Sequence, residues 1–236
     1  MNNPKFSVVT VCYNAVQTIE DTILSVINQT YSNVEYIIID GASTDGTIDV
    51  VNKYLDKISF FVSEPDCGIY DAMNKSLEIA SGDYLLFLGA DDVLYSQDVI
   101  KEVSEKCISS FDVYYGNVIF YPSGKVYKGK FNRFKWGIIN ICHQAIFYPS
   151  CVYKNNKYDL NYKVYADYAY NLKLLSKDVK FEYIDSIVTL YDSSGFSSRT
   201  SDVSFEKDKL KLIRDAVGVF PMFSGILYRL YIKYFR

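Results

Sequence analysis

The 236-residue sequence has one histidine, one tryptophan and only five prolines. A single histidine, His143, excludes metal centres built from several imidazoles and leaves few options for a histidine-based triad. Oxygen ligands, which suit hard cations such as Mg²⁺ and Mn²⁺, are still available. The pattern GxxxxGK[ST] is absent, which excludes a P-loop nucleotide site.

Cysteines are few and have no recognisable spacing. There are five, an odd number, and no CxxC pair occurs: Cys12, Cys67, Cys107, Cys142 and Cys151. Neither a disulfide framework nor a zinc knuckle is indicated. We therefore expect a reduced, cytoplasmic setting.

Long apolar runs are also missing. No stretch approaches 18 uninterrupted apolar residues, and the start, MNNPKFSVV, lacks a basic region followed by an apolar one. We therefore expect neither secretion nor a membrane span. The net charge of -3 gives no basic footprint for nucleic acid. A hydrophobic content of 49% supports a sizeable core, so the chain is a folded protein.

The first half alternates strand and helix patterns. Strands are predicted at Phe6–Cys12, Tyr36–Ile39, Ser59–Val62 and Tyr84–Leu88, and helices at Thr18–Gln29, from Thr47 to about Leu55, and at Ile69–Ala80. The repeats imply right-handed crossovers and a Rossmann-like, mostly parallel sheet flanked by helices, an α/β fold. Ligands bind beyond the carboxyl ends of the strands in such sheets.

The second half has a different texture. A helix is predicted at about Gln97–Glu105, a hairpin from Asp112–Phe120 and Lys125–Phe131, and a loop over the site at Arg133–Asn140. Further strands are predicted at Ala145–Tyr148, Phe181–Ile184 and Ile187–Tyr191, with a helix at Val164–Ser176. We predict one domain over residues 1–219, with a nucleotide-binding half at 1–95 and an acceptor-binding half at 96–219.

Carboxylates follow two of the predicted strands directly. Asp40 precedes GASTDGT, where it either serves ordinary loop chemistry or accepts the imide N–H of uracil. Asp91 and Asp92 stand side by side after the strand YLLFL, an arrangement that is costly unless a cation lies nearby. Their structural alternative is a turn with a helix cap, but a cap needs only one acceptor. The pair therefore favours metal or ribose binding.

The order of four segments resembles family 2 glycosyltransferases of the GT-A fold, the polysaccharide and O-antigen type. The segments are VVTVCYN, IIIDGASTDGT, EPDCGIYDAMNKSL and ASGDYLLFLGADD, and the resemblance covers residues 5–95 closely. It implies that Asp40 binds uracil, that Asp91 faces the ribose and that Asp92 holds a divalent Mn or Mg ion. Gly89 replaces an Asn or acidic residue often found before this element.

Further nucleotide contacts are expected from the same segments. Thr10 and Tyr13 belong to the first strand and the loop after it, and Asp66 and Asp71 to DCGIYDAMNK, which matches the family. Asn74 and Lys75 of this segment are expected to contact the nucleotide or phosphate, or else to shape the helix and its solvated face. Asp45 is expected to be structural, as a cap.

Sugar transfer also needs a base for the acceptor hydroxyl. The resemblance assigns this role to Asp167 in KVYADYAYNLKL, with Asp159 as the alternative. A first-turn helix acid favoured by the macrodipole is the structural interpretation of Asp167. The resemblance also places His143 and Gln144 near the diphosphate and acceptor. Trp136, Tyr165 and Tyr168 are candidate platforms for stacking a sugar.

The tail, residues 220–236, is predicted to be a basic amphipathic helix. Residues 207–236 contain seven cations and two acids, a net charge of +5 in an acidic protein. One helical stripe is apolar, formed by Ile226, Leu227, Leu230, Tyr231 and Tyr234, and another is basic, formed by Arg229, Lys233 and Arg236. The pattern favours an anionic membrane surface, and the alternative is docking on the domain itself or on a second subunit.

With the resemblance, these features predict a metal-dependent glycosyltransferase, peripheral to the inner face of the membrane, and the resemblance implies that it inverts the anomeric centre. It would transfer a hexose or N-acetylhexosamine from a UDP-sugar to a lipid-diphosphate-linked saccharide in surface polysaccharide assembly. The alternatives are a sugar nucleotidyltransferase and a non-catalytic nucleotide-sugar or glycan-binding module. The nucleotidyltransferase is disfavoured because the first turn, CYNAVQT, has no glycine and no cation.

Overall fold

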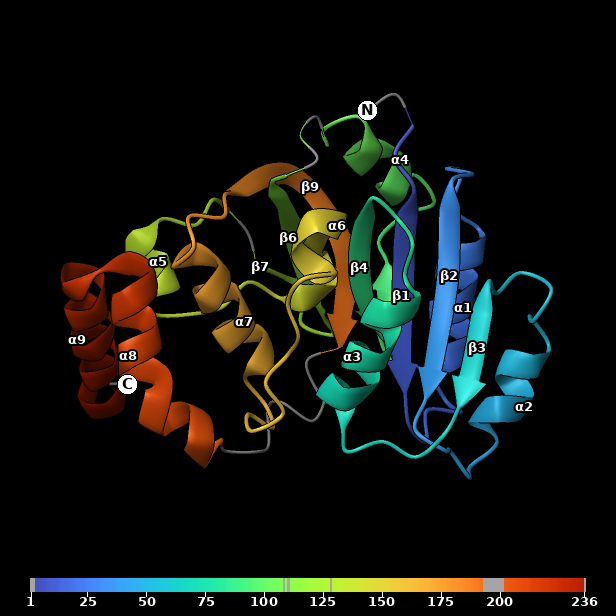
Figure 1. Ribbon diagram of the computed structural model, residues 1–236, viewed down its shortest axis with the longest axis horizontal. Coiled ribbons are helices and arrows are strands. Elements are labelled where there is room, and N and C mark those ends of the chain that lie inside the picture. The colour runs from blue at the N-terminus through green and yellow to red at the C-terminus, as the bar shows by residue number, and fades with distance from the viewer. Residues whose placement is uncertain (1–2, 108, 110, 128, 193–201, 236) are drawn as a thin grey trace.

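The computed structural model describes residues 3–192, apart from 108, 110 and 128, and residues 202–235. For residues 224 and 229–235 it describes only the helical backbone. Within these residues, nine strands form one sheet in the order β3-β2-β1-β4-β8-β6-β9-β5, with β7 paired to β6. Helices flank the sheet (Figure 1). The predicted α/β architecture is therefore confirmed.

The parallel half of the sheet matches the predicted strands to within a few residues. It contains β1 (Phe6–Cys12), β2 (Val34–Asp40), β3 (Phe60–Ser63) and β4 (Tyr84–Gly89), connected through α1 (Ile19–Ile27), α2 (Thr47–Asn52) and α3 (Ile69–Ile79). In the register, Cys12 lies opposite Asp40, and Val11 lies opposite Gly89. The loops that follow these strands therefore gather at one edge.

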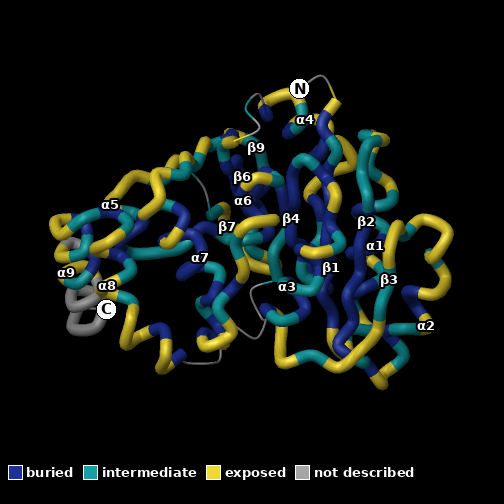
Figure 2. The backbone as a smooth tube through the Cα atoms, viewed as in Figure 1, coloured by how far each residue is buried: buried dark blue, intermediate teal, exposed yellow. Residues whose placement is uncertain are grey.

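Both faces of the parallel strands are buried, which explains their continuous apolar sequences. Val9 packs in one core cluster with Met73 of α3, whereas the preceding residue, Val8, packs in a second core cluster with Ile23 of α1. Figure 1 shows α3 on the near side of the sheet and α1 behind it. Figure 2 shows β1 and β4 as buried along most of their length. Because both of their faces are packed, these strands support the loops that follow them.

The second half of the sheet is mixed, so the parallel strands predicted from the repeats are confined to the first half. β8 (Ile146–Pro149) is antiparallel to β4 and to β6 (Val113–Tyr121), and β9 (Phe181–Asp192) is parallel to β6. The short β5 (Val93–Leu94) and β7 (Lys125–Tyr127) complete it. The two strands predicted within β9 are one strand, because its pairing with β6 continues past a register irregularity.

The second half also contains helices that the sequence patterns did not predict. The segment predicted as a loop after Phe131 begins with α5 (Arg133–Trp136), which Asn132 caps by accepting the Lys135 N–H at 2.9 Å. The remaining elements are α4 (Val99–Ser104), a 3₁₀ turn η1 (His143–Ala145), α6 (Ser150–Tyr153), α7 (Ala166–Leu175), α8 (Val203–Val217) and α9 (Val219–Phe235). Of these, α6 and α8 were not expected.

The C-terminal helix α9 packs against α5 and α8 at the end of the molecule far from α2 (Figure 1). The contact is close: a Cβ atom on Gly137 would lie 2.6 Å from the Pro221 carbonyl oxygen. Phe220, Phe223 and Leu227 are exposed by 84%, 54% and 66%. The stripes predicted beyond residue 228 lie outside the described side chains. No helix among the described residues combines the length and apolarity needed to cross a bilayer.

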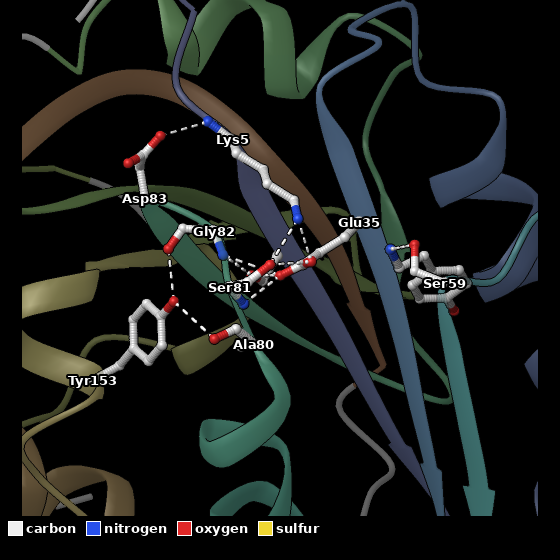
Figure 3. A network of polar contacts seen from close by, with 10 residues as sticks. Lys5, Glu35, Ser59, Ala80, Ser81, Gly82, Asp83 and Tyr153 are labelled. Carbon is white, nitrogen blue, oxygen red and sulfur yellow. Dashed lines mark hydrogen bonds and ion pairs between the residues drawn. The ribbon is translucent and has the colours of Figure 1, made fainter.

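A polar cluster links the strands near the N-terminal ends of β1 and β4 (Figure 3). Glu35 on β2 pairs with Lys5 at 2.6 Å and accepts hydrogen bonds from Ser7 and from the Ser81 N–H and hydroxyl. Tyr153 of α6 donates to the Gly82 carbonyl at 2.6 Å. The cluster therefore joins β2, the start of β1 and the turn before β4.

Candidate functional site

The loops after β1, β2, β3 and β4 bring the predicted nucleotide-binding residues to one edge of the sheet. Thr10, in β1 itself, is fully buried, and its hydroxyl is 3.0 Å from the Tyr36 hydroxyl. Tyr13, in the loop after β1, is 65% exposed. Of these two side chains, only that of Tyr13 is accessible from solvent.

Asp40 is fully buried and bonded within the protein. One carboxylate oxygen, Oδ2, accepts the Ser43 N–H at 2.9 Å and the Ser63 hydroxyl at 2.6 Å. The other, Oδ1, accepts the Ser43 hydroxyl and the Cys12 thiol. Burial, followed by the negative charge of Asp40, raises the pKa of that thiol to above its ordinary range. The carboxylate expected to meet uracil therefore fastens the loop after β2.

Two acids lie in the loop that leads into α3. Asp66 Oδ1 accepts the Gly68 N–H at 2.8 Å, and Asp71 Oδ2 accepts the Cys67 N–H at 3.0 Å. Both side chains are partly exposed. Lys75 pairs with Glu64 at 2.8 Å, and so it holds the same loop from outside.

The other residues singled out in these loops are structural. Asn74 exchanges two hydrogen bonds with the Tyr158 backbone. Asp45 accepts the Thr47 N–H and the Val16 N–H, each at 3.0 Å, so it is structural, but the N-cap position of α2 is Gly46 and not Asp45.

Asp91 and Asp92 point into different surroundings. Asp91 is exposed, whereas Asp92 is 1% exposed and accepts the Gln144 amide at 2.9 Å and the Asp192 N–H at 3.0 Å. Burial and then the neighbouring charge of Asp91 raise the pKa of Asp92 to about 7. Partial burial of its carboxyl group and the charge of Asp192 also raise the pKa of Asp91. The surroundings of both carboxyl groups therefore disfavour their negatively charged forms.

The carboxylates at Asp91 and Asp92 fit a hard divalent cation. A Cβ atom on Gly89 would lie 2.8 Å from Asp91 Oδ1 and 2.6 Å from Asp92 Oδ2, so both oxygens converge over this glycine. In the part of the chain that is described, no three His, Cys, Asp or Glu side chains form a group able to hold a metal. Two carboxylates suit a cation that takes its other ligands from water and a diphosphate.

Asp167 stands at the start of α7, as the sequence predicted, and its carboxylate is held from several sides. Oδ2 accepts the Asn140 amide at 2.8 Å, and Oδ1 accepts the Tyr168 N–H at 2.7 Å. The Tyr70 hydroxyl, which donates to the Val164 carbonyl at 2.6 Å, lies 3.2 Å from Oδ1. The carboxylate is fixed in position with 13% of the side chain exposed.

The alternative base, Asp159, lies elsewhere in the loop before α7. It accepts the Asn161 side-chain amide at 2.9 Å and lies 3.4 Å from Lys173. Hydrogen bonds from Asn161 and the charge of Lys173 lower its pKa, although burial acts in the opposite direction and is the largest single influence. Asp159 is thus an ion-paired residue.

The turn η1 connects the two groups of carboxylates. His143 Nδ1 is 3.5 Å from Asp167 Oδ2, while the next residue, Gln144, donates to Asp92 at 2.9 Å. The Gln144 carbonyl in turn accepts the Thr189 hydroxyl of β9 at 2.6 Å. Two adjacent residues therefore fix Asp167 and Asp92 within one site.

Trp136, expected near the acceptor, is 4% exposed. Its ring packs edge-on against Phe131 and Phe181, with ring centroids 4.9 and 5.1 Å away. Tyr168 is also buried and donates its hydroxyl to the Trp136 carbonyl. A buried ring has no face for a sugar, so the stacking interpretation of these two residues is corrected to core packing. Tyr165 is partly exposed beside Phe205.

Three site residues were not predicted as such. Asn140 lay in the presumed loop, Tyr70 was one of 23 tyrosines, and Asp192 ends a strand. A carboxylate directly after an apolar strand, the signal used for Asp40, also occurs at Asp192. Asn140 and Tyr70 gave no such local signal because their role depends on contacts with the distant Asp167.

The family profile described as Glycosyl transferase family 2 matches residues 7–171. A PGL/p-HBAD biosynthesis glycosyltransferase of Mycobacterium tuberculosis is 33% identical over 211 residues, covering 85% of this chain and 81% of that protein. The Escherichia coli UDP-Glc:alpha-D-GlcNAc-diphosphoundecaprenol beta-1,3-glucosyltransferase WfaP is 31% identical over 194 residues, covering 78% and 76%.

Among solved structures, Staphylococcus aureus TarS 1-349 in complex with UDP-GlcNAc has a TM-score of 0.74 at 19% identity. The match covers 97% of this chain and 73% of that one. At this identity the likeness concerns the fold, which agrees with the predicted GT-A architecture. The sequence matches carry the assignment further, and the chain belongs to glycosyl transferase family 2.

Proposed function

We propose that this glycosyltransferase moves a hexose or N-acetylhexosamine, with inversion, from a UDP-sugar to a lipid-diphosphate-linked saccharide in surface polysaccharide assembly. The observation that carries the proposal is the connection through η1. His143 contacts Asp167 and Gln144 contacts Asp92, so a base and an acidic diphosphate site stand at one edge of the sheet. A single base beside a single donor site suits one direct displacement.

In the proposed reaction, the acceptor hydroxyl attacks the anomeric carbon of the donor. A new C–O bond forms, the bond from that carbon to the diphosphate oxygen breaks, and Asp167 takes the hydroxyl proton. UDP leaves with the bonding electron pair. Asp167 is ready for this role because Asn140 and the Tyr168 N–H fix its carboxylate.

Asp91 and Asp92 are the proposed site of a divalent Mn or Mg ion, which when bound supplies positive charge to the diphosphate. The accessible carboxylate is that of Asp91, and the Asp92 oxygens are already engaged by Gln144 and the Asp192 N–H. We therefore revise the expected division of roles. In the revised proposal the Asp91 carboxylate contacts the ion, and the Asp92 carboxylate forms the inner side of the site next to Gly89.

The UDP donor and lipid-linked acceptor are supported by the relatives. The name of WfaP specifies UDP-glucose and a diphosphoundecaprenol acceptor, and a TarS structure holds UDP-GlcNAc. With a lipid-linked acceptor, the proposed location of the enzyme is the cytoplasmic face of the membrane. The exposed Phe220, Phe223 and Leu227 follow one face of α9 and are proposed to enter the interfacial region.

Product analysis tests the proposal directly. The purified chain is incubated with UDP-glucose, UDP-galactose or their N-acetyl forms, a synthetic diphospholipid saccharide, and Mn²⁺ or Mg²⁺, and products are examined by mass spectrometry. Gain of one sugar by the lipid and release of UDP are expected. Formation of UDP-sugar from UTP and sugar 1-phosphate would instead support a nucleotidyltransferase. Nucleotide binding without transfer to any acceptor would support a binding module.

Liposome flotation tests the membrane contact. Replacing Phe220, Phe223 and Leu227 together by serine is expected to reduce binding to anionic vesicles several-fold. Phe111→Ser is the control, because Phe111 is 72% exposed and lies outside the tail. If the triple variant floats like the unmodified chain, α9 is not the anchor. Loss of a dimer in the same variant, measured by light scattering, would assign the stripe to a second subunit.

A further inference from the structure

The backbone that leads into α7 is held on two sides at Val164. Its carbonyl oxygen accepts the Tyr70 hydroxyl at 2.6 Å, and its N–H donates to Asp202 Oδ2 at 2.9 Å. Tyr70 belongs to α3, and Asp202 is the N-cap residue of α8, which packs beside α7 (Figure 1). Two elements far apart in the sequence therefore hold the residue that lies shortly before Asp167.

Asp202 is a buried carboxylate, 4% exposed, with bonds to two helices. Oδ1 accepts the Phe205 N–H at 3.0 Å and so caps α8. Oδ2 accepts the N–H groups of Val164 and Tyr165, at 2.9 and 3.2 Å. Burial acts to raise the pKa of Asp202 and is the largest single influence, but the backbone hydrogen bonds together lower that pKa. A charged carboxylate thus links the start of α8 to the segment before α7.

Tyr70 approaches Asp167 itself as well as Val164. The side chain is buried, and its hydroxyl lies 3.2 Å from Asp167 Oδ1. Burial and then the charge of Asp167 raise the pKa of Tyr70 well above its usual range, so the phenol keeps its hydrogen. The ring packs against that of Tyr158, with centroids 5.5 Å apart. Tyr70 therefore joins the segment before α7 to the proposed base from the side opposite Asp202.

We propose that Tyr70 and Asp202 position Asp167 for proton removal by holding the backbone at Val164, an arrangement called here the Val164 clamp. The inference rests on the proposed function, in which Asp167 is the base. Asn140 orients one carboxylate oxygen of Asp167, whereas the clamp fixes where α7 begins and hence where that carboxylate stands. Misplacing a reacting group by about 1 Å can cost about 10²-fold in rate, so such support affects turnover without contact with the substrate.

Tyr70→Phe tests the clamp, because it removes the hydroxyl and keeps the ring. The matched control is Tyr153→Phe: Tyr153 is also a buried phenol, and it donates to the Gly82 carbonyl at 2.6 Å, in the turn before β4. Each variant leaves a backbone carbonyl short of a donor, so both should lower the unfolding temperature similarly. Only Tyr70→Phe is expected to lower kcat, by about tenfold, with KM for the UDP-sugar within about twofold. The kinetics use the UDP-sugar and diphospholipid saccharide that give transfer in the product analysis.

Asp202→Asn tests the other side of the clamp. An amide has one acceptor oxygen, so it cannot both cap α8 and hold Val164 through separate oxygens. We expect kcat to fall several-fold while the calorimetric affinity for UDP is unchanged. Asp83→Asn is the control, because Asp83 also accepts a backbone N–H, that of Lys5 at 2.8 Å, in the turn before β4. Thermal unfolding verifies that each variant folds; should Asp202→Asn not fold, the Tyr70 and Tyr153 variants decide alone.

A double variant shows whether the clamp acts through Asp167. Tyr70→Phe combined with Asp167→Asn should cost no more activity than Asp167→Asn alone, because the base to be positioned is already absent. A further fall of about tenfold would overturn the clamp. The clamp is also overturned, while the base stands, if Asp167→Asn is inactive but Tyr70→Phe and Asp202→Asn match their controls. If Asp167→Asn is fully active, the base and the clamp fail together.

Discussion

The Asn140 side-chain amide donates to Asp167 Oδ2 at 2.8 Å and fixes the carboxylate proposed as the base. Asn140 is itself oriented, because its carbonyl oxygen accepts the Asn171 amide at 3.0 Å. Asn171 in turn accepts the buried Tyr148 hydroxyl at 2.8 Å. A chain of polar side chains thus runs from the core between β8 and α7 to the site, and it determines where Asp167 points.

Replacing Asn140 by alanine is expected to lower kcat about tenfold while KM for the UDP-sugar stays within about twofold, since the loss concerns positioning of the base. Steady-state kinetics with the donor varied give both constants. Asn155→Ala is the control, because the exposed Asn155 amide bonds only to the Cys151 carbonyl among the contacts described. An equal fall for both variants, or a change confined to KM, would contradict the positioning role.

Asp167→Asn removes the proposed base without changing its shape. We expect kcat to fall about 10² to 10⁴-fold, the range typical of general-base loss. UDP binding, measured by calorimetry, should remain unchanged. Asp159→Asn should retain most of the activity, because Asp159 pairs with Lys173. If the Asp159 variant is the inactive one, the base assignments are reversed.

The divalent ion is tested through UDP binding. At UDP concentrations near 100 times Kd, binding stabilises a protein by about 2.7 kcal/mol, which thermal shift detects readily. We expect Mn²⁺ or Mg²⁺ to increase the UDP-dependent stabilisation, and EDTA to abolish that increase. Asp91→Asn should lose the metal effect, whereas Asp21→Asn, an exposed acid on α1, should keep it. A metal-independent UDP response in the unmodified chain would remove the ion from the proposal.

The sequence predicted the parallel half of the fold well because its signals are local. Continuous apolar strands such as Phe6–Cys12 and the turn residues after them need no tertiary information. The second half depends on pairing over long distances. Strand β9 crosses the polar pair Asp185-Ser186 only because β6 lies beside it, and β5 exists only through two residues paired with β9. Such elements leave little local pattern.

The site divides in the same way. Carboxylates after strands were found, since a polar residue at the end of an apolar run is visible in the sequence. The sequence alone does not distinguish their surroundings, because burial separates them: Asp40 is enclosed by serines from two loops, while Asp66 is partly exposed beside Gly41. Trp136 was misjudged for a similar reason. Its partners Phe131 and Phe181 are far apart in the sequence.

The last prediction concerns stability at the edge of the sheet away from the site. Burial by itself would raise the pKa of Glu35, but hydrogen bonds from Lys5, Ser7 and Ser81 outweigh it and lower the pKa from 4.5 to about 2 (Figure 3). A carboxylate with a depressed folded-state pKa stabilises the protein at pH values above its unfolded pKa. This contribution is lost as the pH falls from about 4.5 towards 2.

Glu35→Gln should therefore lower the free energy of unfolding at pH 7 by about 1 to 3 kcal/mol, because it removes the negative charge that accepts the hydrogen bonds from Lys5, Ser7 and Ser81. At pH 3 the difference between the two proteins should be smaller, since the unmodified chain has by then lost part of the contribution. Urea denaturation at the two pH values measures both differences.

Glu78→Gln is the matched control: Glu78 also pairs with a lysine at 2.6 Å, but its side chain is 68% exposed. Because exposed ion pairs contribute little, its effect should be much smaller than that of the Glu35 variant. Equal destabilisation of the Glu35 variant at pH 7 and pH 3 would show that its contribution comes from packing and not from the charged hydrogen bonds.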